Sequence, residues 1–179
     1  MRLLTKFQFV LLAVCCGCES RPQAPVLRNS PVYQSETEGF RFRVPDGWSQ
    51  TANSTLPSGE VPRDVFLARY SLETSEGGAS LQVLGRNDVP SAQLVEHLSQ
   101  PAFGVEKWEL LEPPIPITVD SVPAERLVLQ GLLQGKPMIK HATCFHRNAR
   151  LYTFVGMYSK TDQNARQQIE RAVDSLLWE

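Results

Sequence analysis

The chain has 179 residues, of which 42% are hydrophobic and 21% are charged. This composition is typical of a globular protein and excludes disordered, collagen-like and coiled-coil chains. A formal net charge of −1 supplies no basic surface for gripping phosphate backbones, so we expect no nucleic-acid partner. Four cysteines are too few for a disulfide scaffold.

The N-terminal residues have the pattern of an export signal. Arg2 and Lys6 precede an apolar run at 7–16, which is too short for a membrane helix because such a helix needs about 20 apolar residues. A small residue and Cys18 follow, which resembles the lipobox of bacterial lipoproteins, where the cysteine receives a lipid. We therefore predict a lipoprotein signal peptide at 1–17 and lipidation of Cys18.

The match to the lipobox leaves two alternatives open. Cys15 occupies the position three residues before Cys18, where leucine is usual, so ordinary secretion or a retained anchor would also fit. With lipid on Cys18, Cys144 is the one remaining thiol, and the exported domain relies on its core instead of a disulfide. Losing Arg2 and Lys6 leaves 16 basic against 19 acidic residues, so acyl chains would hold the protein at a membrane.

The rest of the chain divides into a linker and one domain. Residues 18–32 are expected to form the lipidated N-terminus and an extended spacer, because Pro22, Pro25 and Pro31 recur there with little apolar content. Residues 33–179 are expected to form a single domain. The predicted location is the bacterial cell envelope, with the domain facing the periplasm or the exterior.

Alternation of apolar and polar residues predicts strands along most of the domain, interrupted by a polar loop at 51–62. Short turns between the last three strands force an antiparallel meander. Shorter extended pieces are expected around three prolines, at 108–111 and 115–119. The longer predicted strands cover residues 39–44, 65–72, 80–86, 124–133, 138–146 and 151–158.

Two helices are predicted. Ser91 is a suitable N-cap for a short helix that ends near Pro101, and Thr161 for a long helix at 161–177. The long helix carries an apolar stripe that must cover one face of the sheet. The stripe consists of Ala165, Ile169, Ala172, Val173, Leu176 and Leu177.

One motif suggests a family. The aromatic strand at 39–44 runs into Val44-Pro45-Asp46-Gly47-Trp48, and a strand ending in Val-Pro-x-Gly-Trp resembles the PsbP family. Related members are the DcrB-like envelope lipoproteins and a eukaryotic Ran-binding nuclear transport factor. The resemblance implies an α+β fold, with an antiparallel β-sheet sandwiched by helices and a C-terminal meander followed by an amphipathic helix. It implies no functional residue, because proteins that share a fold can have unrelated functions.

The most suggestive chemical pattern is His141, Cys144 and His146, whose spacing suggests a metal site. Strand alternation puts Cys144 and His146 on one face and His141 on the other. Zinc sites need three or four protein ligands, so we expect neither a metal nor another cofactor. The sequence also lacks the Gly-x-Ser-x-Gly elbow of serine hydrolases.

These observations favour a non-catalytic envelope lipoprotein that binds a protein partner or helps to assemble a complex. The alternative is a small-ligand carrier or an enzyme with a pocket between sheet and helix. For that pocket the candidate residues are Cys144, His146, Tyr152 and Tyr158. A cavity in which these side chains converge would favour the alternative, and a flat packed sheet would disfavour it.

Overall fold

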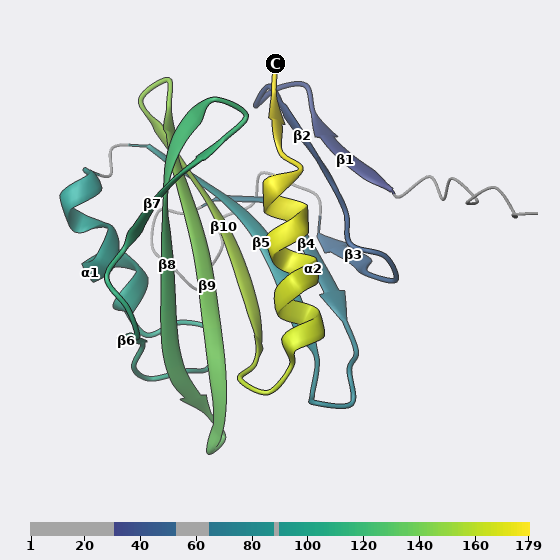
Figure 1. The fold of residues 1–179 in the computed structure, drawn as a ribbon, viewed down its shortest axis with the longest axis vertical. Coiled ribbons are helices and arrows are strands. Elements are labelled where there is room, and N and C mark those ends of the chain that lie inside the picture. The colour runs from purple at the N-terminus through teal and green to yellow at the C-terminus, as the bar shows by residue number, and fades with distance from the viewer. Residues whose placement is uncertain (1–30, 53–64, 88–89) are drawn as a thin grey trace, which may run out of the picture.

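The computed structural model describes residues 31–52, 65–87 and 90–179 (Figure 1). The predicted signal peptide, Cys18 and most of the predicted linker lie outside the described residues, as does most of the predicted polar loop. Within the described part, no helix has the length and apolar character needed to cross a bilayer.

An eight-stranded antiparallel sheet forms the centre of the domain (Figure 1). Its strands lie side by side in the order β3-β4-β5-β10-β9-β8-β6, and β7 pairs with another stretch of β8. The predicted meander is confirmed, since β8 pairs with β9 and β9 with β10, all antiparallel. The strands are β3 (Ser49–Ala52), β4 (Val65–Leu72), β5 (Ala79–Asn87), β6 (Glu109–Leu110), β7 (Ile115–Val119), β8 (Val122–Leu133), β9 (Lys136–Arg147) and β10 (Arg150–Ser159).

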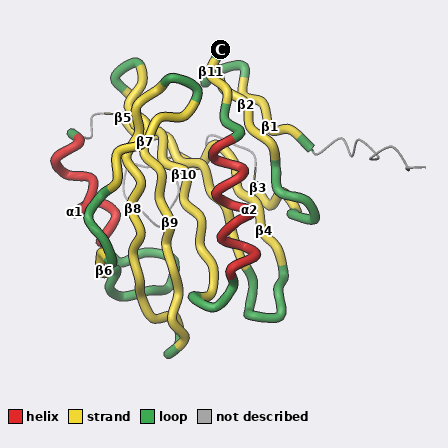
Figure 2. The backbone as a smooth tube through the Cα atoms, in the orientation of Figure 1, coloured by secondary structure: helices red, strands yellow, loops and turns green. Residues whose placement is uncertain are grey.

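A second, three-stranded sheet covers part of one face (Figure 2). It consists of β1 (Val32–Ser35), β2 (Phe40–Arg43) and β11 (Leu177–Trp178), in the order β1-β2-β11. The sequence predicted only the middle strand of the three. In the main sheet, β3 likewise extends into residues predicted to be a polar loop, because it pairs with β4.

The helices are shorter than predicted. Helix α1 (Leu94–Ser99) follows a 3-10 turn at Ser91–Gln93, so its N-cap is Gln93 and not Ser91. Helix α2 (Gln163–Asp174) is capped by Asp162, whose carboxylate accepts a hydrogen bond from the Ala165 amide at 2.9 Å. The predicted cap, Thr161, instead donates its hydroxyl proton to Glu76.

The predicted apolar stripe is confirmed for its first four residues, whereas Leu176 is buried but lies beyond the end of the helix. Ala165, Ile169, Ala172 and Val173 are buried, but the helix ends at Asp174. Leu177 therefore lies in β11, opposite Arg41 of β2, and is 43% exposed. The stripe misled the prediction because residues of a short strand can also satisfy a helical spacing.

Each face of the main sheet carries its own core. On the α2 face, Phe40 and Phe42 of β2 pack edge-on against Phe154 of β10, with ring centroids 5.9 and 5.5 Å apart. On the opposite face, α1 and Trp108 pack over β8. The buried residues of this second core are Leu94, Leu98, Val105, Trp108, Leu127, Leu129, Ala142, Cys144 and Leu151.

The predicted fold class is confirmed in its coarse form. The domain is α+β and antiparallel, but strands dominate it. Helix α1 covers one face with only a short segment, and α2 shares the other face with the three-stranded sheet (Figure 2). The helical layers of the predicted sandwich are therefore incomplete.

A glycine fixes how closely α2 approaches the sheet. A Cβ atom on Gly156 of β10 would lie 2.4 Å from Cγ2 of Ile169, well inside van der Waals contact. The absence of a side chain lets Ile169 of α2 pack directly on the strand. This contact positions the polar faces of α2 described next.

Candidate functional site: a groove beside the C-terminal helix

Helix α2 presents a polar stripe next to its buried one. Four hydrogen-bonding residues occur at spacings of four, three and four, which places them on one face of the helix. They face the chain segment that leaves β2 and line a groove with it. These residues are Asn164, Gln168, Arg171 and Ser175.

The groove has a volume of about 480 Å³ and runs between α2 and residues 43–46. Its second wall comes from the motif identified in the sequence, because Arg43, Val44, Pro45 and Asp46 all line it. Gly47 follows with a φ of +82°, a left-handed conformation that favours glycine. The motif therefore shapes the groove wall as well as turning the chain.

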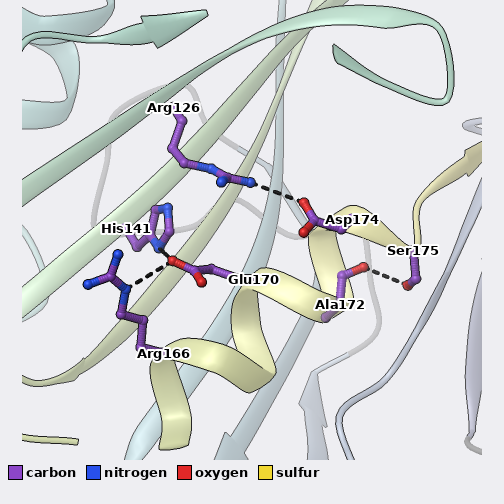
Figure 3. Close-up of polar contacts among 7 residues, drawn as sticks. All are labelled: Arg126, His141, Arg166, Glu170, Ala172, Asp174 and Ser175. Atoms are coloured by element: carbon purple, nitrogen blue, oxygen red, sulfur yellow. Dashed lines mark hydrogen bonds and ion pairs between the residues drawn. The ribbon is translucent and has the colours of Figure 1, made fainter. Parts of the chain in front are cut away.

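Two hydrogen bonds tie the walls together. The Trp48 indole Nε1 donates to Oε1 of Gln168 at 2.6 Å, and the Arg43 backbone amide donates to Oγ of Ser175 at 2.8 Å. Ser175 Oγ in turn donates to the Ala172 carbonyl at 2.7 Å (Figure 3). Both bonds therefore join the motif segment directly to α2.

The charges in the groove are unevenly neutralised. Arg43 and Arg171 are exposed, and neither makes an ion pair within the described residues. Asp174 forms an ion pair with Nη2 of Arg126 at 3.1 Å (Figure 3). Asp46 also takes part in a polar interaction. The groove therefore offers two guanidinium groups whose hydrogen-bonding capacity is available to a ligand.

On its other side, α2 contacts the sheet through a charged cluster. Glu170 accepts a hydrogen bond from Arg166 at 3.0 Å, and its Oε1 lies 3.7 Å from Nδ1 of the buried His141 (Figure 3). Burial, followed by the charge of Arg126, lowers the pKa of His141 to about 4 against the opposing effect of Glu170. His141 is therefore neutral at neutral pH, and the ion pair that joins α2 to the sheet here is the one between Asp174 and Arg126 of β8.

A buried lysine lies on the opposite face of the sheet. Nζ of Lys140 donates to the Leu98 carbonyl at 2.7 Å and lies 4.3 Å from the Trp108 ring centroid and 5.4 Å from that of Phe103. Burial lowers the pKa of Lys140 to about 7. The hydrogen bond thus joins the end of α1 to β9, away from the groove.

The structure separates the four pocket candidates into two pairs. Cys144 and His146 lie on the α1 face of β9, where Cys144 is buried with Sγ 3.8 Å from Oγ1 of Thr153, while His146 is exposed. Tyr152 and Tyr158 are buried on the α2 face. The sheet lies between the pairs, so the four side chains do not converge on one cavity.

The remaining polar contacts of these candidates are structural. The Tyr152 hydroxyl donates to Oε2 of Glu38 at 3.0 Å, and burial raises the pKa of Tyr158 to about 12. His141 lies on the face opposite Cys144, as strand alternation predicted. Across the described ranges, no three His, Cys, Asp or Glu side chains are grouped in a way that could hold a metal ion.

The groove residues were not predicted as a site. A signal was available in the sequence, since polar residues at 164, 168, 171 and 175 form a stripe beside the apolar one. The stripe alone is also compatible with a solvated helix face. Its partner wall at 43–46 is far away in sequence, and no local pattern links the two segments.

No protein-family model matches the sequence, and no curated protein matches it. Solved structures do match. The solution structure of cyanobacterial PsbP (CyanoP) from Synechocystis is 15% identical, with 83% of this chain and 92% of that chain covered and a TM-score of 0.58. The Ran-binding protein Mog1p of Saccharomyces cerevisiae is 14% identical, with 84% and 95% covered and a TM-score of 0.51.

Likeness at such identities establishes the fold alone. The two structures correspond to two of the relatives implied by the Val-Pro-x-Gly-Trp motif, so the resemblance in fold is confirmed. The chain has the PsbP-like fold.

Proposed function

We propose that the chain is a non-catalytic, lipid-anchored protein of the bacterial envelope that binds a protein partner through the groove between α2 and residues 43–46. Cys18 would carry the lipid, and residues 18–32 would link it to the domain. The bound partner would thereby be held beside a membrane.

The groove is the observation that carries this proposal. It has about 480 Å³ of open space, two walls tied together by hydrogen bonds, and two arginines without carboxylate partners among the described residues. A preorganised surface of this kind lowers the entropic cost of binding. Mog1p, which shares the fold, is a Ran-binding protein, so protein binding is one use to which this fold is put.

The arrangement of the pocket candidates favours binding over the alternative of an enzyme or small-ligand carrier. That alternative needs Cys144, His146, Tyr152 and Tyr158 around one cavity, but the sheet lies between the two pairs. A nucleophile and its base also need hydrogen-bond contact, whereas the buried Cys144 thiol lies 3.8 Å from the Thr153 hydroxyl.

Site-specific photo-crosslinking in living cells tests the binding role. A benzophenone amino acid replaces Asn164 in the groove, or Glu96 on α1 as a control, since both positions are exposed on helices on opposite faces of the sheet. We expect one adduct of defined mass, identified by mass spectrometry, from position 164 and none from position 96. An absence of adducts at 164, or the same adducts at both positions, would contradict the proposal.

A further inference from the structure

We propose that the partner segment recognised in the groove is acidic and extended, with carboxylates that pair with Arg43 and Arg171. This inference rests on the proposed function and adds the chemistry of the partner. Three properties of the groove support it: the pairing of its charges, the positions of the two arginines and the length of the polar stripe.

The groove lining holds two arginines and two aspartates, but the aspartates do not pair with the arginines. Arg43 and Arg171 make no ion pair within the part of the chain that the structure describes. Of the two acids that line the groove, Asp174 is drawn toward Arg126 on β8 (Figure 3), and Asp46 is engaged in another interaction. A ligand with carboxylates would supply the negatively charged partners that the two arginines lack.

The positions of the arginines favour a chain over a single ion. Arg43 ends β2 on one wall, while Arg171 lies in the last turn of α2 on the other. A guanidinium group binds a carboxylate through two parallel hydrogen bonds. A segment lying along the groove can present one carboxylate to each wall, so the two arginines would also fix its orientation.

The polar stripe sets the length of the segment. Residues 164–175 of α2 and its cap span roughly 16 Å at about 1.5 Å per residue, which matches about five residues of extended chain. Gln168 uses its Oε1 to accept from Trp48, so its amide protons are available for carbonyl groups of the segment. The stripe can therefore bind main chain while the arginines bind side chains.

The net charge of the molecule provides no long-range attraction for an acidic segment. After loss of residues 1–17, the chain would carry 16 basic and 19 acidic residues, so an acidic segment is not attracted from a distance. Binding must come from contacts within the groove, where two exposed charges are screened by salt. We expect modest affinity that falls as the salt concentration rises.

The test uses the full chain purified in a neutral detergent and a short fluorescein-labelled peptide of alternating glutamate and aspartate. The control peptide has glutamine and asparagine at the same positions. Fluorescence anisotropy should show binding of the acidic peptide only. Arg43→Gln and Arg171→Gln should each weaken it about tenfold, the effect of losing one charge-assisted hydrogen-bonded pair. Raising NaCl from about 50 to about 500 mM should weaken it further.

Arg166→Gln provides the matched control. Arg166 lies on the same helix and is exposed, but it pairs with Glu170 outside the groove, so its loss should change the affinity less than twofold. Equal binding of the two peptides, or binding that survives both groove substitutions, would overturn the inference. If the chain binds inorganic phosphate at the two arginines but does not bind the peptide, the groove is a small-anion site, and the inference is overturned too.

The inference and the proposed function can fail separately. If the crosslink from position 164 persists when Arg43 and Arg171 are both replaced by glutamine, the groove binds a protein whose recognition does not use the arginines. The inference then falls while the proposed function stands. If the crosslink from position 164 is absent in the unsubstituted chain, the proposed function falls.

Discussion

Replacing Lys140 by methionine is expected to stabilise the folded domain by about 3 kcal/mol at pH 7. The side chain is only 2% exposed, and burial lowers its pKa from 10.5 to about 7, a shift that costs about 1.4 kcal/mol per unit. The hydrogen bond to the Leu98 carbonyl and the cation–π contact with Trp108 each offset about 1 kcal/mol of that cost. Methionine keeps an unbranched apolar side chain in contact with Trp108 and Phe103 without the buried charge.

The pH dependence separates this effect from packing. The unfolded lysine keeps its proton up to about pH 10.5, whereas the folded one loses it near pH 7. The folded state binds fewer protons between these values, so the free energy of unfolding must rise with pH across that window. Burial raises the pKa values of Tyr70 and Tyr158 to about 12, so these folded tyrosines stay protonated below pH 9.5.

Urea unfolding at pH 7 and pH 9.5 is the measurement. The unmodified chain should gain several kcal/mol between the two values, and Lys140→Met should gain almost nothing. Parallel pH profiles for the two proteins would show that Lys140 keeps its ordinary pKa, and that the aromatic rings and the carbonyl fully compensate for its burial.

Replacing Trp48 by alanine is expected to destabilise the domain by about 3–5 kcal/mol, the usual cost of deleting a buried aromatic side chain. Trp48 is 7% exposed and belongs to the core on the α2 face. Its indole also donates to Gln168 across the groove, so the substitution should loosen the groove walls as well as the core.

Trp48→Phe is the matched control, because phenylalanine keeps most of the apolar contact but cannot donate to Gln168. We expect it to cost about 1–2 kcal/mol, part of which is the lost hydrogen bond. Urea unfolding at one pH compares the three proteins. A cost below about 1 kcal/mol for Trp48→Ala would mean that the indole is not a core residue in solution.

The main strands could be predicted from the sequence because their signals are local. Alternation in β4, β8, β9 and β10, and turns such as Gly135 at a φ of +78°, depend only on neighbouring residues. The flanking strands of the small sheet gave no such signal. Four residues after Pro31 form β1, and Leu177 leaves the helical stripe only because β2 offers it a pairing partner.

The groove could be predicted only in part. Its helical wall is visible as a polar stripe, but the hydrogen bond between Arg43 and Ser175 joins residues 132 positions apart. Pairings over such separations are set by the tertiary fold and leave no trace in a local pattern. The same limit applies to Lys140, whose burial depends on Trp108 and Leu98 folding back over β9.

We propose that lipid on Cys18 holds this domain at a membrane. Metabolic labelling with an alkyne fatty acid tests it most directly, with Cys144→Ser as a control because it removes the buried thiol and keeps Cys18. We expect label on the unmodified chain and on Cys144→Ser, recovery of both in the detergent phase, and no label on Cys18→Ser. Equal labelling of Cys18→Ser, or an unlabelled parent chain in the aqueous phase, would contradict the claim.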